Sequence, residues 1–213
     1  KVVFLSEGIT ARRKSGYVNS PQYDVTHEEM KKMKKEVEIR KKHAKKALKI
    51  LGVQQVRFLD LPNQELDQIP LLKIIKEIER EIFETKASII FTHHYNDLNL
   101  DHRVAYEATI TAARPIPDSK VSSIISFEIP AATDWRKPYK FNPNLYIDIS
   151  SQLTAKINAL KAYQYEFRKP PHPRSKEITD AVAKRWGSLS GFKAAEAFEI
   201  IFSRMNNLEN VSL

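Results

Sequence analysis

Cysteine is absent from the 213-residue sequence, which excludes disulfide bonds and thiolate metal sites. Any bound metal ion must therefore be held by His, Asp or Glu. Long apolar runs are absent as well, since none approaches the ~20 residues that a membrane-spanning helix needs. The sequence also lacks internal repeats, low-complexity tracts and convincing linkers. We therefore expect a soluble, cytoplasmic protein without stable membrane insertion, folded as a single domain over residues 1–213.

The net charge of +9 is concentrated in one segment. Residues 28–49 contain ten Lys or Arg and four Glu. Thr26 and Glu29 form a capping-box signature, and apolar residues recur at helical spacing up to Gly52. This pattern predicts an amphipathic helix over residues 27–51 whose lysines face solvent. No aromatic residues interleave with the lysines, so we do not expect nucleic-acid binding.

Short β-branched and aromatic runs alternate with helical patterns along the rest of the chain. Strands separated by helices of this length predict an α/β protein with a Rossmann-like three-layer fold, in which helices flank a mostly parallel sheet. The chain from Ser150 onward is expected to form a helical C-terminal tail. The predicted strands cover residues 2–5, 53–61, 87–92 and 121–128, and the predicted helices cover residues 27–51, 71–82, 104–112, 153–165, 175–186 and 194–202.

The segment 89–103 is the most informative part of the sequence. A predicted strand leads into a loop with three of the six histidines and two aspartates, and the loop leads into a helix. Ligands bind at the carboxyl ends of strands in α/β proteins, and imidazole with carboxylate is a typical ligand set for a catalytic metal. One hypothesis is a self-contained site with two histidines and one carboxylate. Its ligands would be His93 or His94, Asp97 and His102.

The motifs of this segment carry a family resemblance. Thr92-His93, Asp97-Leu98-Asn99, Asp101-His102-Arg103 and Ala112-Ala113-Arg114-Pro115 closely resemble the second signature of the PIG-L (LmbE-like) deacetylases. These are zinc-dependent enzymes that remove acetyl groups from N-acetylated amino sugars. The chain looks most like the branch found in bacterial surface-sugar and lipopolysaccharide biosynthesis. Further matches, spread over the whole chain, include residues 4–8, 58–62, 143–144, 148–150, 171–175 and 195–198.

The resemblance implies a single Zn2+ ion, but only part of its site is in this sequence. Family members open with an Ala-His-Pro-Asp-Asp-Glu-like motif that supplies two zinc ligands and the general base. That motif is absent here, and we expect it in a strand–helix unit upstream of Lys1. Only His102 is carried over as a ligand, and Asp101 is expected to cap its helix, to orient the site, or both. The alternative is a non-catalytic sugar-binding relative that lacks the first motif.

The reaction that the resemblance implies also needs an acid that protonates the leaving amine. Many relatives have histidine where Asn99 stands, and asparagine donates a hydrogen bond without transferring a proton. His172, in the proline-rich loop 171–175, is therefore our candidate acid. Arg174 in the same loop is expected to bind an anionic part of the substrate. Ser175 is expected to be the N-cap of the following helix.

The loop after the first strand is expected to line the sugar pocket, as it does in relatives, and the alternative is an ordinary exposed loop. Asp60 and Asn63, at the end of the next strand, are expected either to bond sugar hydroxyls or to hold the turn. The predicted partner is an N-acetylated sugar or a sugar nucleotide, and a homo-oligomer is compatible with the sequence. The candidate substrate-binding residues in these loops are Glu7, Gly8, Arg12, Arg13, Asp60 and Asn63.

Overall fold

The computed structural model describes residues 1–205, and the chain divides into two compact units. Unit 1 combines Lys1–Gln68 with Ile147–Glu196, and unit 2 combines Ile69–Tyr146 with the chain from Ala197 onward. Each unit therefore contains an early and a late part of the sequence. The prediction that residues 1–213 form one family domain stays a prediction.

Unit 1 contains a pair of parallel strands and three α-helices. The strands β1 (Val2–Ser6) and β2 (Val56–Leu61) pair in parallel. The predicted capping box is confirmed, because Thr26 Oγ1 accepts from the Glu29 amide and the Glu29 carboxylate accepts from the Thr26 amide. The apolar face of the first helix is buried and includes Met33 and Ala47, of which Ala47 packs with alanines of the α4 region. The helical segments are η1 (Thr10–Arg12), α1 (His27–Ile50), η2 (Leu66–Gln68), α4 (Leu153–Lys161) and α5 (Lys176–Ser190).

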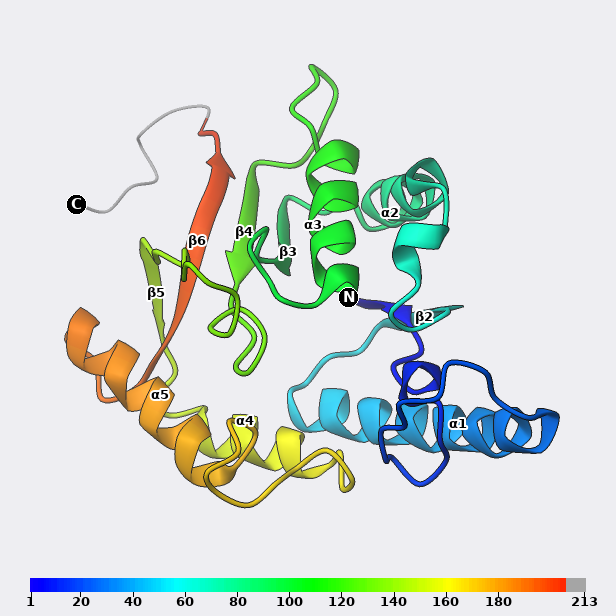
Figure 1. Cartoon of the computed structure of the whole chain (residues 1–213). Helices are drawn as coiled ribbons and strands as arrows, with labels where there is room; N and C mark the ends of the chain where they lie inside the picture. Colours follow the sequence, from blue (N-terminus) through cyan, green and yellow to red (C-terminus); the bar gives the residue numbers. More distant parts are fainter. Residues whose placement is uncertain (206–213) are drawn as a thin grey trace. The chain divides into compact units, whose positions relative to one another are not determined.

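Unit 2 is built around the second sheet, whose strand order is β3-β4-β6-β5. Figure 1 shows β3, β4 and β6 side by side, with α3 next to β3. Thr92 of β3 hydrogen-bonds Thr109 of α3, and the two helices α2 and α3 pack together. The elements are α2 (Leu71–Thr85), β3 (Ile89–His93), α3 (Leu100–Ala112), β4 (Ser123–Phe127), β5 (Leu145–Asp148) and β6 (Ala195–Ser203). Residues of β5 and β6 belong to both units.

The α/β class is confirmed, but the C-terminal tail is not wholly helical. The prediction of a helix over residues 194–202 is wrong, because Ala195–Ser203 form strand β6, which pairs antiparallel with β4. The second sheet is therefore mixed, since β3 and β4 pair in parallel. Small and apolar residues at Ala195 and Ala197 fit a buried strand as well as a helix, and pairing with β4 decides between them. Strand β5 was not predicted at all.

Candidate active site

The loop between β3 and α3 is organised by Asn99 and Asp97. Asn99 is the N-cap of α3, and its side-chain oxygen accepts from the Asp101 amide at 2.9 Å. The prediction that Asp101 caps the helix is wrong, because the helix begins one residue before it and Asp101 lies buried in the first turn. Asp97 is fully buried and accepts from the Asn99 amide at 2.8 Å and from Thr133 Oγ1 at 2.7 Å. These contacts hold the loop in place within unit 2.

His102 lies in the first turn of α3 and faces Asp97. Its Nδ1 lies 3.1 Å from Asp97 Oδ1, a close contact without the alignment of a full hydrogen bond. Burial raises the pKa of the Asp97 carboxyl, but the interactions with His102, Thr133 and the Asn99 amide outweigh it and leave the pKa below its ordinary value. Asp97 is therefore a carboxylate at neutral pH. An imidazole held through Nδ1 by a carboxylate presents Nε2 to a metal, the usual pattern around zinc-bound histidine.

His93, the last residue of β3, packs on the face of His102. The two rings stack with centroids 4.1 Å apart and an interplanar angle of 19°. Burial, followed by the proximity of His102, lowers the pKa of His93 to about 3. His93 is therefore neutral at physiological pH, and it restricts the orientation of the neighbouring ring.

His94 points to a different partner. It is fully buried, its Nδ1 accepts from the Asn96 amide at 3.1 Å, and its Nε2 lies 3.2 Å from Glu199 of β6. His93 ends β3 and His94 begins the loop that follows it, and the two side chains have different partners. Within residues 1–205, no three His, Asp or Glu side chains lie close enough together to hold a metal ion. The self-contained site of two histidines and one carboxylate is therefore not formed there.

In unit 1, Glu7 fastens the loop that follows β1. Its carboxylate accepts from the Ile9 amide at 2.6 Å, from the Thr10 amide and hydroxyl, and from the Asn63 amide at 3.2 Å. The predicted substrate-binding residues Glu7 and Asn63 are thus brought together, with Glu7 joining the loops that follow β1 and β2. The carboxylate has these structural partners whether or not it also meets a sugar.

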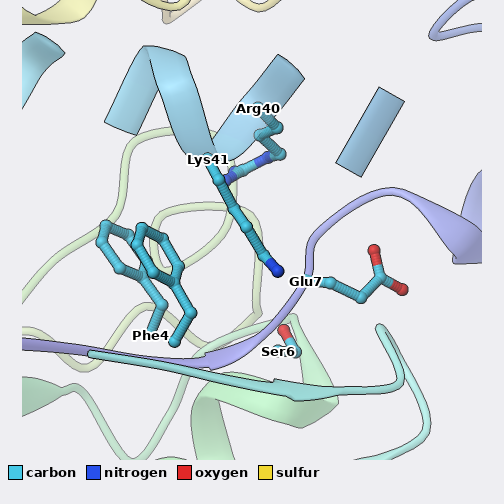
Figure 2. A pocket seen from close by; sticks show the side chains of 6 residues that line it. Phe4, Ser6, Glu7, Arg40 and Lys41 are labelled. Carbon is cyan, nitrogen blue, oxygen red and sulfur yellow. The ribbon is translucent and has the colours of Figure 1, made fainter. Parts of the chain in front are cut away.

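The remaining predicted residues of these loops also have identifiable contacts. Asp60 adopts a left-handed backbone (φ 55°) and accepts from Lys41 Nζ at 2.7 Å. Arg13 forms an ion pair with Glu65. A small pocket lies beside Lys41, and Figure 2 shows Arg40 and Lys41 reaching toward it from α1. Its other lining residues are Phe4, Ser6, Glu7 and Phe58.

Three arginines of unit 1 converge on Glu166. Arg40 Nε lies 2.9 Å from Glu166 Oε1, Arg174 donates to Oε2 at 2.7 Å, and Arg12 approaches Oε1 at 3.7 Å. Arg12 and Arg174 were predicted from the sequence, whereas Arg40 and Glu166 were missed. Neither missed residue belongs to a recognisable motif, because Arg40 is one of many cations on α1 and Glu166 follows α4 in an irregular segment.

His172 is joined to this cluster through Arg174. Its Nδ1 accepts from the Arg174 amide at 3.0 Å, so the proton of the neutral ring lies on Nε2. The side chain is exposed, and partial burial, then Arg174 and Arg168, lower its pKa. Ser175 is confirmed as the N-cap of α5. Unit 1 therefore brings together the loops that contain Gly8, Arg12 and His172, whereas their convergence with His102 of unit 2 stays a prediction.

Comparisons with known proteins identify the family of the chain. A family model described as PIG-L, GlcNAc-PI de-N-acetylase, matches residues 1–113. The chain therefore belongs to the PIG-L family, as its motifs predicted. The assignment to a lipopolysaccharide-related branch stays a prediction.

Solved structures show the same fold at low sequence identity. N,N'-diacetylchitobiose deacetylase from Pyrococcus horikoshii has a TM-score of 0.65 and 17% identity, over 94% of this chain and 72% of that one. The A40926 pseudoaglycone deacetylase Dbv21 has a TM-score of 0.65 and 17% identity, over 97% and 87%. GalB, the 4-carboxy-2-hydroxymuconate hydratase of Pseudomonas putida, has a TM-score of 0.67 and 18% identity, over 96% and 85%. The chain thus has the fold of LmbE-like deacetylases.

No helix within residues 1–205 is both long and apolar enough to cross a membrane.

Proposed function

We propose that the protein is a zinc-dependent deacetylase of an N-acetylated amino sugar or sugar conjugate. The observation that carries this proposal is the contact of His102 with the buried Asp97 at the start of α3. It supports a role for His102 as a neutral ligand that binds metal through Nε2, with Asp97 fixing the ring and His93 packing on its face.

Two further zinc ligands are needed, because a catalytic zinc has about three protein ligands and an open position. Residues 1–205 supply the imidazole of His102 as one metal ligand and the Asp97 carboxylate that orients it, which is the part of such a site that they hold. We propose that the family's first motif supplies the other ligands and the general base. Bound zinc would polarise the acetamide carbonyl and make water nucleophilic near neutral pH.

Two residues of this chain would then donate a hydrogen bond to the acetamide oxygen and a proton to the leaving amine. The Asn99 side-chain oxygen is used to cap α3, which leaves its NH2 group to donate to the acetamide oxygen. His172 holds its proton on Nε2 in the neutral ring and carries a second proton when charged, so the imidazolium would protonate the leaving amine. Its lowered pKa makes that imidazolium a stronger acid than an ordinary histidine.

A non-catalytic sugar-binding protein is the second candidate. The fold itself admits other chemistry, since GalB is a hydratase. A relative without the first motif would keep the loops of unit 1 and lose hydrolysis.

The test compares acetate release from N-acetylated sugars and sugar nucleotides by the native gene product, with and without added Zn2+. We expect hydrolysis that a chelator abolishes and Zn2+ restores, and we expect His102→Ala to lower zinc affinity in calorimetry. The exposed His27→Ala on α1 is the control. Undiminished zinc affinity in His102→Ala would refute the ligand assignment. Sugar binding without hydrolysis, in a protein saturated with Zn2+, would favour the second candidate.

A further inference from the structure

The arginine cluster of unit 1, defined as Arg12, Arg40 and Arg174 around Glu166, is unbalanced in charge. Three guanidinium groups share one carboxylate, which leaves two positive charges without a counter-charge among the contacts of Glu166. Arginine stays charged in proteins, so the imbalance is permanent. Burying such groups is unfavourable unless each is paired and hydrogen-bonded.

Arg12 is the least satisfied member of the cluster. Among residues 1–205, its Nε is buried without a hydrogen-bond partner, its closest carboxylate contact is 3.7 Å, and its contact with the Tyr17 carbonyl is a long 3.5 Å. Burial is the main reason that the pKa of Arg12 is lowered, and the neighbouring Arg40 and Arg174 lower it further against the opposing effect of Glu166. Buried donors without partners are uncommon in native proteins. An anion beside Arg12 would supply the missing acceptor.

Gly8 makes the position of Arg40 possible. Its backbone is left-handed (φ +78°), and a Cβ there would lie 2.8 Å from Arg40 Cζ and Nε. Tyr163 supports the same guanidinium, whose carbon lies 5.4 Å from the ring centroid. Arg40 also lines the small pocket of Figure 2, so the cluster is continuous with a recess of the unit. These contacts hold a cation at the end of β1, where ligands bind in α/β folds.

The exposure of the side chains shows where a ligand enters. Arg12, Arg40 and Glu166 are 19%, 22% and 13% exposed, whereas Arg174 is 48% exposed. Arg174 therefore faces solvent while the other groups form the base of the cluster. Planar guanidinium groups match the oxygen pairs of phosphate, and a phosphate monoester carries about two negative charges at neutral pH. These two negative charges would balance the two positive charges of the cluster that Glu166 leaves uncompensated.

We propose that Arg12, Arg40 and Arg174 bind a phosphate group of the substrate, so that the substrate is a phosphorylated N-acetyl sugar or a sugar nucleotide. The assignment of an N-acetyl sugar as the substrate rests on the proposed function. The assignment of a phosphate group on that substrate rests on the arginine cluster alone. Glu166 holds the three arginines in place in the absence of ligand and competes with phosphate for them.

The test is calorimetric titration of the whole protein with inorganic phosphate, N-acetylglucosamine 1-phosphate and N-acetylglucosamine. We expect the phosphorylated sugar to bind at least about tenfold more tightly than the free sugar, as one charge-assisted contact predicts. Arg12→Gln and Arg174→Gln should each lose about tenfold in affinity for both phosphate compounds. Arg185→Gln, on the exposed surface of α5, is the matched control and should bind like wild type.

Glu166→Gln separates a binding site from a purely structural network. It preserves the shape of the side chain and removes the competing charge, so phosphate should bind more tightly. Equal affinity for free and phosphorylated sugar in the wild-type protein would overturn the proposal. So would unchanged phosphate affinity in folded Arg12→Gln and Glu166→Gln, with folding checked by circular dichroism. Phosphate binding without deacetylation would refute the proposed function and leave the phosphate site standing. Deacetylation of a phosphorylated N-acetyl sugar with a KM that Arg12→Gln does not change would do the reverse.

Discussion

Comparing alanine substitutions at Gly8 and Gly52 separates the stability that the position of the Arg40 side chain contributes from the cost of a strained backbone. Both glycines have a left-handed backbone, with φ of +78° and +72°. Within the described residues 1–205, a Cβ at Gly52 meets nothing within 4 Å, whereas a Cβ at Gly8 would lie 2.8 Å from the Arg40 guanidinium. Alanine at either position incurs the same backbone penalty, about 1–2 kcal/mol. Only Gly8→Ala also displaces Arg40.

The extra destabilisation in Gly8→Ala follows from what Arg40 loses. Its Nε donates to Glu166 Oε1 at 2.9 Å, with both side chains less than a quarter exposed. A hydrogen bond between charged groups contributes about 1.5–3 kcal/mol, and displacement weakens it without removing either charge. We therefore expect Gly8→Ala to be about 1–2 kcal/mol less stable than Gly52→Ala.

The assay is urea denaturation of the wild type and both variants, followed by circular dichroism. The effect of alanine on the unfolded chain is common to both variants and cancels in their difference. The double variant Gly8→Ala with Arg40→Gln should lose less than the sum of its single changes, because the clash and the ion pair involve the same atoms. Equal stability of Gly8→Ala and Gly52→Ala, or full additivity with Arg40→Gln, would refute the reasoning.

Local features of the fold could be predicted from the sequence. The capping box at Thr26 and the N-cap at Ser175 are short-range signals, and both are present in the structure. Strands β1 to β4 were predicted from β-branched and apolar runs. The helix cap at Asp101 was misplaced by two residues, because Asn99 and Asp101 are both good caps and only the backbone conformation distinguishes them.

Long-range features could not be predicted from the sequence. Strand β6 depends on antiparallel pairing with β4, whose paired residues lie 71 to 80 positions earlier in the chain, and not on its own propensity. Glu166 gains its importance from arginines that lie 126 and 8 residues away along the chain. The family motifs indicated the histidine of α3 but not the Asp97 contact behind it. Contacts of this kind are set by topology, for which a single sequence has no local signal.

Three further predictions concern stability. Asn99→Ala removes the N-cap of α3 and should cost about 0.5–2 kcal/mol in urea denaturation, whereas Asn99→Ser should retain most of the stability; equal losses would contradict the cap assignment. Gly187→Ala places a Cβ 2.6 Å from the Phe192 carbonyl and 2.8 Å from Ala194 Cα, both backbone atoms, and should destabilise the protein by about 1–3 kcal/mol or more, whereas Gly191→Ala, with open space around it, should lose only the backbone contribution. The last concerns His94, whose pKa is lowered by burial despite Glu199 and Asp97 nearby. Because the unfolded chain binds this proton more readily than the folded one, stability is present above about pH 6.5, the ordinary pKa of histidine, and falls as the pH decreases below it. Each such proton contributes up to about 1.4 kcal/mol per pH unit, so His94→Gln should flatten the decline in unfolding free energy between pH 7 and pH 5, while the exposed His27→Gln should leave it unchanged. The amide side chain introduced by His94→Gln can still accept from the Asn96 amide and donate to Glu199, which preserves the polar contacts of His94 with these two residues. An unaltered slope in this variant would show that the buried imidazole is not the group whose protonation destabilises the fold.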